Sequence, residues 1–349
     1  MRAIAPRTLA LLLVVSSSAV RPAHATEPFA RVGYGFTGLE NPRGVRNLGM
    51  GATGTSDASG MATGYFNPAS IAFAKATTLF GSYESMPFDQ GYSNIEIAAP
   101  IPLHSDSTTG AWQFAGSLGF SYLNFPVLEE RTIFLPEGTG HTYDPDAWGL
   151  SAAGATSWTH GVMRLAGGAA ASYQKQETPR GGFDLMALDF GVISAFPISL
   201  DNGMVFRPRL GYAMLNLDTG ADFDRTDIRI ANESRGGFGF DVAAPTVIVA
   251  EKTVPSIAFS LDYDRIDREN SSLRFSAGAE LKIVDMVHLR YGALDNQYDT
   301  YGVGVGWDFG HALFRLDYAH ASLRDDSIEQ ILEENFDRDV FGIIMGMRW

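Results

Sequence analysis

Apolar and polar side chains alternate with a period of two through the C-terminal part of the chain. In residues 301–309, for example, Tyr, Val, Val, Trp and Phe alternate with three glycines and one aspartate. The same alternation marks residues 257–264, 273–283, 314–318 and 341–349. Because successive side chains of a β-strand point to opposite faces, each segment predicts a strand with one apolar face and one polar face.

The length and the polar faces of these segments favour a membrane barrel over a soluble β-sandwich, the alternative that alternation alone leaves open. The segments span about 9–11 residues, the length of a tilted strand that crosses a bilayer, whereas soluble strands average about 5–6. Their polar faces carry arginines and carboxylates, which a water-filled lumen tolerates more readily than a dry core. Tyr, Trp and Phe gather at the segment ends, where interfacial girdles are expected.

Fourteen such segments fit into residues 76–349, and single-chain bacterial barrels have even strand numbers. We therefore predict an all-β fold, a transmembrane antiparallel β-barrel of about 14 strands. In the N-terminal part the expected strands are 76–83, 92–99, 112–124, 148–158, 162–174, 183–195, 204–216 and 238–250. Near the C-terminus we expect long connections at 323–339, 295–300 and 265–271 and short ones at 310–312 and 284–286. Pro245 makes the 238–250 strand the weakest of the set.

Residues 1–25 have the pattern of a secretory signal peptide. Arg2 and Arg7 precede an apolar run at 9–15, and Ala23-His24-Ala25 provides a cleavage site between small residues. The run is shorter than the roughly 20 residues of a membrane anchor, the alternative interpretation. Together with the strand pattern, it predicts a protein of the cell outer membrane, integral after signal-peptide cleavage.

The composition excludes several kinds of function. The chain has no cysteine, so it must be stable without disulfides and offers no thiolate chemistry. Its net charge of -14 argues against nucleic acid as a partner. The GxSxG and HExxH motifs are absent from the sequence, and we expect neither an enzyme nor a bound metal or cofactor.

Residues 26–75 precede the first predicted strand and are rich in small side chains without the alternation. A barrel of about fourteen strands encloses a lumen wider than its own side chains fill. Glycine lets a backbone pass close to a wall. We therefore expect residues 26–75 to form a hatch inside a barrel of residues 76–349.

The stretch 46–72, RNLGMGATGTSDASGMATGYFNPASIA, resembles the opening of the FadL-like outer-membrane barrels, and its LGMG and NPA elements are most similar to PorV-type members. The C-terminal run around SAGAELKIVDMVHLRYGA resembles the closing strands of the same group. This resemblance implies a fourteen-stranded barrel with an N-terminal hatch that transports long-chain fatty-acid-like molecules passively and releases them through a gap in the wall. It also implies a gate at Gly49, Met50, Gly51, Asn67, Pro68 and Ala69.

PorV-type relatives imply a different function, that of an outer-membrane component of a type IX-like secretion system that binds exported proteins. A structural barrel whose acidic loops contact the cell exterior is a third possibility.

The acidic stretches 217–227 and 324–339 are expected to be solvated loops, and the alternative is a divalent-cation bridge to lipopolysaccharide. The expected partners are outer-membrane lipid and lipopolysaccharide, hydrophobic small molecules, the barrel-assembly machinery and, in the rival function, secretion-system proteins.

Charged residues on the polar faces of the predicted strands are expected to line the lumen: Arg207, Arg209, Arg274, Glu280, Arg290, Arg315 and Asp317. The simpler interpretation is that they pair across strands and fix the wall to the hatch. The alternative is that Arg207 and Arg209, two residues apart, bind a carboxylate headgroup. Trp349 ends the chain at a position whose side chain is expected to face lipid. This terminal aromatic residue resembles the signal that the barrel-assembly machinery recognises.

Overall fold

In the computed structural model, the described residues are 44–60, 64–86, 90–102, 111–124, 128–129, 140, 142–143, 146–178, 181–217, 220–223, 226–229, 231–249, 252–269, 273–295, 297–323 and 337–348. The predicted signal peptide, the predicted hatch before residue 44, most of the acidic stretch 324–339 and Trp349 lie outside these residues.

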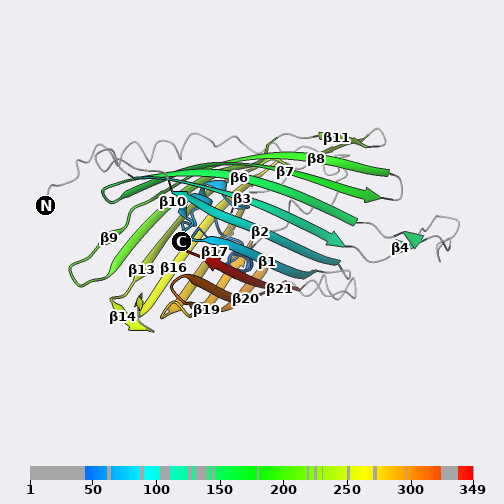
Figure 1. Cartoon of the computed structure of the whole chain (residues 1–349). Helices are drawn as coiled ribbons and strands as arrows, with labels where there is room; N and C mark the ends of the chain where they lie inside the picture. The colour runs from blue at the N-terminus through cyan, green and yellow to red at the C-terminus, as the bar shows by residue number, and fades with distance from the viewer. Residues whose placement is uncertain are drawn as a thin grey trace. The chain divides into compact units, whose positions relative to one another are not determined.

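Fourteen long antiparallel strands close into a barrel (Figure 1). One sheet holds fifteen strands, of which the two-residue β9 (Ile198–Ser199) only pairs with the end of β10. The ring closes because β21 pairs with β1 and β10 pairs with β13. The wall strands are β1 (Thr77–Met86), β2 (Gln90–Pro102), β3 (Ala111–Asn124), β6 (Asp146–His160), β7 (Met163–Thr178), β8 (Gly181–Ala195), β10 (Val205–Leu217), β13 (Glu233–Ala243), β16 (Ile257–Arg268), β17 (Arg274–Ile283), β18 (Val287–Leu294), β19 (Tyr298–Asp308), β20 (Ala312–Leu323) and β21 (Arg338–Met347).

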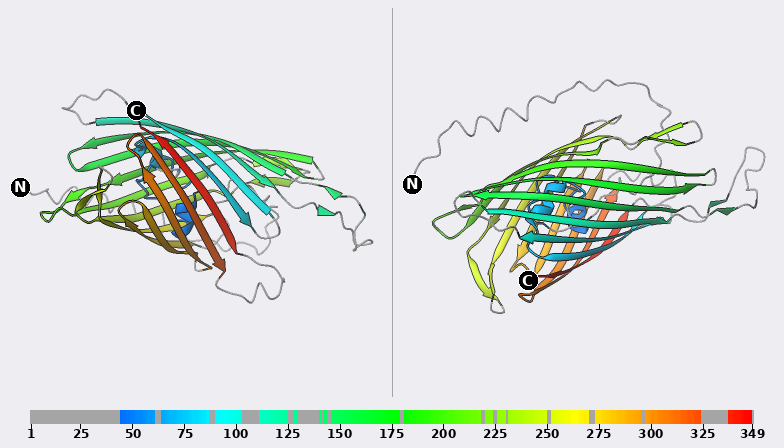
Figure 2. Two further views of the ribbon diagram at one scale, coloured as in Figure 1. Left: turned by 60° about the horizontal axis from the view of Figure 1, so that its bottom comes forward. Right: turned by 45° about the horizontal axis from the view of Figure 1, so that its top comes forward.

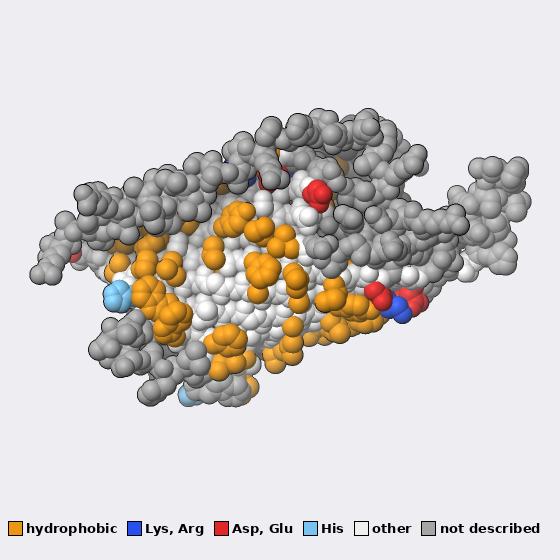
Figure 3. All heavy atoms as spheres, turned by 90° about the horizontal axis from the view of Figure 1, so that it is seen from above, with side chains coloured by type: hydrophobic (Ala, Val, Ile, Leu, Met, Phe, Trp, Pro, Cys, Tyr) orange, Lys and Arg blue, Asp and Glu red, His pale blue; other side chains and the backbone are white. Residues whose placement is uncertain are grey.

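The period-two pattern divides each wall strand between an outer and an inner face, as the sequence predicts. On β19, Tyr301, Val303 and Val305 are exposed on the outer face, while Thr300 is buried on the inner face. Where Figure 3 shows described residues, hydrophobic side chains and uncharged atoms predominate and charged side chains are few. An exposed apolar surface of this kind is typical of barrels in contact with lipid. None of the helices among the described residues has the length and apolarity of a membrane span.

The predicted strand 238–250 is wrong in both its bounds. Strand β13 begins at Glu233, where polar and glycine residues hide the alternation, and ends at Ala243. Pro245 cannot donate a ladder hydrogen bond, so it ends the wall strand. Residues after it form a separate hairpin, β14 (Thr246–Val249) with β15 (Lys252–Pro255), outside the wall sheet. Two other hairpins pair β4 (Leu128–Glu129) with β5 (Thr142–Tyr143) and β11 (Gly220–Phe223) with β12 (Thr226–Arg229).

The connections divide into two rims. The terminal rim joins strands at 103–110, 161–162, 196–204, 244–256, 284–286 and 309–311 and also carries the end of β21. The loop rim joins strands at 87–89, 125–145, 179–180, 218–232, 269–273, 295–297 and 324–337. The expected alternation of length holds at 324–337 and 309–311, but the long connection predicted at 295–300 spans only 295–297. Pairing of Tyr298 with Leu323 extends β19 past the apolar part of the strand.

Residues 44–60 and 64–76, here called the inner segment, pack against the inner face of the barrel (Figure 2). Its helix α2 (Val45–Gly49) contacts β18, β19, β20 and β21, and its 3-10 helix η1 (Pro68–Phe73) contacts β3, β6, β7 and β8. Val45 and Leu48 join an apolar cluster with Phe80 and Ile344. A second apolar cluster surrounds η1, and it comprises Ala69, Ile71, Ala72, Phe73, Ala98, Ala115, Ala155, Ala166, Ile193 and Ala195.

Candidate functional site

Glycines of the wall let the backbone of the inner segment approach β17 and β18. A Cβ atom at Gly278 would lie 2.1 Å from the carbonyl oxygen of Met50, and one at Gly292 would lie 2.2 Å from the nitrogen of Gly51. Gly51 itself has a φ of +70° and lies against the backbone of Ala293. Only glycine combines this dihedral angle with so close a contact.

A second row of glycines receives the turn before η1. Added Cβ atoms would lie 1.9 Å from Oδ1 of Asn67 at Gly191 and 2.6 Å from the carbonyl carbon of Pro68 at Gly168. At Gly211 a Cβ atom would lie 2.0 Å from the carbonyl oxygen of Thr55. These glycines belong to β7, β8 and β10, so three adjacent wall strands are shaped to receive the inner segment.

Asn67 joins the two parts of the inner segment to the wall. Its Oδ1 accepts a hydrogen bond from the Ala69 N–H at 3.0 Å and so caps η1. Its Nδ2 lies within hydrogen-bond distance of the carbonyl oxygens of Thr55 (2.7 Å), Val192 (3.2 Å) and Tyr212 (3.3 Å). The side chain is fully buried, and its amide therefore satisfies backbone groups that water cannot reach.

Asp264 of β16 binds the turn of the inner segment at residues 54–55. Its Oδ2 accepts hydrogen bonds from the Gly54 N–H at 2.9 Å, the Thr55 N–H at 3.1 Å and the Thr55 hydroxyl at 2.8 Å. Asp264 is fully buried, and three donors to one carboxylate oxygen compensate for part of the cost of burying its charge.

Arg46 and Asp57 carry the only charges of residues 44–60, and they bind each other at 2.7 Å. Arg46 also binds Glu280 of β17 at 2.8 Å, and Asp57 lies 3.6 Å from Arg209 of β10. Burial alone would lower the pKa of Arg46, but Asp57 and Glu280 raise it well above its ordinary value. Burial alone would raise the pKa of Asp57, but Arg46 and Arg209 hold it below its ordinary value.

The wall continues this ion-pair network around the lumen. Arg209 binds Asp241 at 3.0 Å and Asp262 at 3.1 Å. Glu280 binds Arg290 at 2.9 Å, and Lys282 and His288 each lie 3.4 Å from it. Asp317 forms ion pairs with Arg290 and Arg315, each at 2.8 Å. Among the described residues, no group of three or more His, Asp or Glu side chains could hold a metal ion.

The sequence-predicted lumen residues therefore fall into two sets. Five belong to the buried network: Arg209, Glu280, Arg290, Arg315 and Asp317. Arg207 is half-exposed at 3.5 Å from Asp241, and Arg274 is half-exposed beside Asp295, close to the loop rim. The predicted gate residues Gly49, Met50, Gly51, Asn67, Pro68 and Ala69 all lie buried in the inner segment.

Sequence reasoning missed Arg46 as the centre of this network. Arg46 lies in a stretch without apolar–polar alternation, so the sequence does not predict which way its side chain points. Its isolation among small uncharged residues, with Asp57 as the only other charge, is the signal that could have identified it. The proposed pairing of Arg207 with Arg209 on one headgroup does not fit, because Arg209 is buried among three carboxylates.

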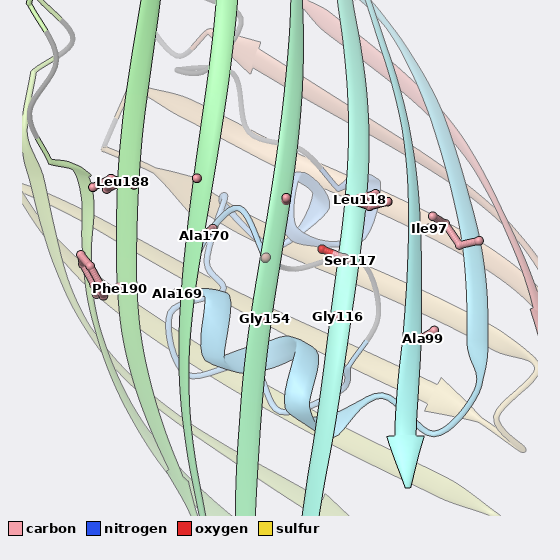
Figure 4. A pocket seen from close by; sticks show the side chains of 13 residues that line it. Ile97, Ala99, Gly116, Ser117, Leu118, Gly154, Ala169, Ala170, Leu188 and Phe190 are labelled. Atoms are coloured by element: carbon pink, nitrogen blue, oxygen red, sulfur yellow. The ribbon is translucent and has the colours of Figure 1, made fainter.

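An apolar pocket of about 640 Å³ opens on the outer face of β2, β3, β6, β7 and β8 (Figure 4). Its floor consists of small residues that face outward, among them Gly116, Ala152, Gly154, Ala169 and Ala171. Bulky exposed side chains stand around this floor: Ile97, Leu118, Leu188 and Phe190. It is an open depression in the apolar outer surface rather than an enclosed cavity.

A smaller polar cavity of about 40 Å³ lies on the inner side of the same wall. It lies against Gly64 and Tyr65 of the inner segment and is also lined by Glu96, Asp189 and Glu233. Ser117, Ala153 and Ala170 line both this cavity and the outer pocket. The wall between lumen and outer surface is therefore one strand layer with small side chains at this level.

These features define an antiparallel β-barrel of the outer-membrane type with a segment of its own chain packed inside. Among solved structures, the chain is similar to the Pseudomonas putida toluene transporter TodX, with 10% identity, coverage of 88% of this chain and 98% of that chain, and a TM-score of 0.52. A Pseudomonas aeruginosa FadL homologue matches at 9% identity over 87% of this chain and 97% of its own, with a TM-score of 0.43.

The β-domain of the Bordetella autotransporter BrkA matches at 13% identity over 78% of this chain and 98% of its own, with a TM-score of 0.46. At these identities the likeness shows the fold alone. No protein-family model matches the chain, and no curated protein matches its sequence. The finer resemblance to PorV-type proteins stays a prediction.

Proposed function

We propose that this chain is an integral barrel of the outer membrane that transports hydrophobic or amphipathic molecules passively. The observation that carries the proposal is the apolar pocket of about 640 Å³ on the outer face, separated from a lumen cavity by one layer of small-residue strands. A hydrophobic molecule that passes from the water-filled lumen to this lipid-facing surface gains free energy by leaving water, at about 25 cal/mol per Å² of apolar area buried. The pocket is thus a site where the molecule rests between lumen and lipid.

In this proposal, the inner segment is the gate of the barrel. It is bound to at least seven wall strands by glycine contacts, ion pairs and hydrogen bonds, so the lumen is closed at its level while the segment stays in place. Transport then requires displacement of part of the segment. Binding of the transported molecule supplies the differential free energy for that displacement, without an external energy source.

Lipid and lipopolysaccharide are the proposed partners of the outer wall, and the barrel-assembly machinery is the proposed partner during insertion. The exposed apolar side chains of the strands support the first part, because such a surface is stable only in lipid or detergent. The terminal rim, which carries the end of β21, faces the periplasm in this arrangement, since bacterial barrels hold both termini there.

The proposal is tested by filling the pocket. Ala169→Leu adds bulk to its floor, and Ala277→Leu adds the same bulk to an exposed position on β17, outside the pocket. We expect Ala169→Leu to slow the flux of a fluorescent long-chain alcohol into proteoliposomes by about tenfold, the effect of losing about 1.4 kcal/mol of binding. Ala277→Leu should leave the flux unchanged. Equal flux in both variants and the wild type would remove the pocket from the pathway.

A further inference from the structure

The small polar cavity beside the inner segment has an acidic lining. Three carboxylates contribute to it: Glu96 of β2, Asp189 of β8 and Glu233 of β13. The remaining polar groups are hydroxyls and one amide, from Tyr65, Ser117, Ser151, Ser172 and Asn216. No lysine, arginine or histidine belongs to the lining among the described residues. The cavity is therefore rich in hydrogen-bond acceptors and carries negative charge.

Adjacent residues of the same strands divide between this cavity and the outer apolar pocket. Glu96 lines the cavity, and its neighbour Ile97 lines the pocket. Asp189 lines the cavity, and its neighbours Leu188 and Phe190 line the pocket. The division arises because successive side chains of a strand point to opposite faces. An acidic site on the lumen side and an apolar site on the lipid side thus lie back to back across one strand layer.

A β-bulge shapes the cavity where β8 meets β10. The pairing of these strands shifts register between Met214 and Leu217, and Asn216 within the bulge has a φ of +58°. The Asn216 N–H donates a hydrogen bond to Oδ1 of Asp189 at 2.7 Å. Bulges re-aim side chains, and this one brings Asp189 and Asn216 to the same cavity.

A buried amide without partners lies next to the cavity. Asn94 precedes Glu96 by two residues on β2, so both side chains belong to the inner face, about 7 Å apart along the strand. Asn94 is 1% exposed, yet neither its Oδ1 nor its Nδ2 has a hydrogen-bond partner in the described part of the chain. Buried amides are almost always hydrogen-bonded, because an unsatisfied one costs free energy. An unsatisfied acceptor beside an acidic cavity indicates a ligand that donates hydrogen bonds.

We propose that the cavity and Asn94 together bind a positively charged headgroup that donates hydrogen bonds, a primary ammonium. The three N–H donors of an ammonium match carboxylate, hydroxyl and amide acceptors. A volume of about 40 Å³ accommodates such a headgroup but not an alkyl chain. No group of three or more His, Asp or Glu side chains among the described residues could hold a metal ion, so the larger ammonium suits the site better than a divalent metal.

This inference rests on the proposed transport function and narrows its class of substrate. A fatty-acid-like carboxylate, which the sequence resemblance implies, brings negative charge to three carboxylates, and like charges repel. Glu96 is buried, so water screens this repulsion weakly. A protonated amine brings the opposite charge, and a neutral molecule brings none. The barrel therefore transports amphipathic amines and neutral hydrophobic molecules in preference to carboxylates.

Binding measured without transport tests the site. The full chain in a neutral maltoside detergent is titrated with decylamine, decanol and decanoate, which share a chain and differ in headgroup charge, and the heat from protein-free micelles is subtracted. Neutral pH keeps the amine protonated, and high salt screens the surface charge of the protein. Heat-modifiable gel migration confirms that each barrel is folded.

Two double variants of equal net charge are compared. Glu96→Gln/Asp189→Asn removes two carboxylates of the cavity, keeps their size and leaves an acceptor for the Asn216 N–H. Glu177→Gln/Asp201→Asn removes two exposed carboxylates and is the matched control. We expect wild type and the control to bind decylamine about tenfold more tightly than decanol, and decanoate more weakly than decanol. The cavity variant should bind decylamine and decanol alike.

Two further probes define the headgroup. Decyltrimethylammonium carries the same charge as decylamine without N–H donors, so equal affinity for the two would overturn the assignment of a hydrogen-bonding headgroup. Methylammonium identifies the source, because competition with decylamine indicates a site for free ammonium ions and its absence indicates a headgroup attached to a chain.

The outcomes separate this inference from the proposed function. A preference for decylamine that survives in the cavity variant, or no preference in the wild type, would overturn the inference even if Ala169→Leu slows the flux of the alcohol. Conversely, an amine preference that depends on the cavity, together with equal flux in Ala169→Leu and Ala277→Leu, would contradict the proposed function alone.

Discussion

Nε and Nη2 of Arg46 both donate to Oε2 of Glu280, at 3.0 and 2.8 Å, although the two residues are 234 positions apart in the chain. Arg46 lies in α2 of the inner segment and Glu280 in wall strand β17. Both side chains are buried, so water does not screen the pair. Through this contact, the packing of the inner segment contributes to the stability of the barrel.

Removal of the Glu280 charge tests this link. In Glu280→Gln the side chain keeps its size, but Arg46 and Arg290 lose their shared carboxylate. We expect a loss of about 3–5 kcal/mol in the free energy of unfolding in urea, the usual cost of leaving a buried charge without its partner. Glu177→Gln, which breaks a solvent-exposed pair with Lys175, should leave the unfolding curve unchanged. A loss of similar size in both variants would show that burial of the pair is irrelevant.

The wall glycines allow a steric test of how the inner segment packs against the wall. A Cβ atom at Gly211 would lie 2.0 Å from the Thr55 carbonyl oxygen, whereas a Cβ atom at Gly167 would meet no atom within 4 Å. Gly211→Ala should therefore displace the inner segment and raise the ion conductance of the barrel in planar bilayers. Gly167→Ala should conduct as the wild type does. If Gly211→Ala conducts like the wild type, the segment does not close the lumen at this level.

A substitution at Asn67 tests whether its amide donors stabilise the inner segment against the wall. In Asn67→Asp the shape is kept, but the buried carbonyl oxygen of Thr55 and the part-buried ones of Val192 and Tyr212 face an acceptor instead of a donor. We expect a loss of at least about 1–3 kcal/mol in unfolding free energy, the cost of unsatisfied buried polar groups. Asn202→Asp is the matched control, because Asn202 accepts a hydrogen bond from the Met204 N–H on the exposed rim. Equal stability of both variants would contradict the assigned contacts.

Acid should release the contribution of Asp57. Arg46 and Arg209 hold the pKa of Asp57 below its ordinary value of 3.8, so its stabilisation is complete above pH 3.8 and is lost as the pH falls through the lowered pKa. Asp57→Asn imitates the protonated form at every pH. The difference in unfolding free energy between wild type and Asp57→Asn should be constant above pH 3.8 and shrink below it. A difference that does not change with pH would show that the carboxylate charge is not involved.

Strand parity predicts the barrel and its inner charges because a strand with lipid on one side and water on the other must alternate. Thus Glu280, Arg290, Arg315 and Asp317 could be placed on the inner face from the sequence, and all four are buried there. The parity signal weakens where inward and outward residues are alike, as in β13, whose first five residues are Glu, Ser, Arg, Gly and Gly. There the bounds could not be predicted.

The contacts of the inner segment could not be predicted by parity because they depend on three-dimensional register. Gly191, Gly211, Gly278 and Gly292 look in the sequence like any small strand residue, and only the structure shows what each receives. The small-residue character of 47–73 indicated that its backbone packs closely against something. The pairing of Arg46 with Glu280 required the closed barrel.

The central claim is that the inner segment is a gate that must move for transport. A Cβ atom at Gly342 of β21 would lie 2.5 Å from Cγ2 of Val45 in α2, and its next contacts are at 3.4 Å or more, so Val45→Cys/Gly342→Cys places two thiols within reach of a disulfide in a chain that has no other cysteine. The measurement is the flux of a fluorescent long-chain alcohol into proteoliposomes before and after reduction, with each single cysteine variant as control. The account predicts that flux is lost in the oxidised barrel and returns on reduction. Equal flux in the oxidised and reduced barrel would contradict it.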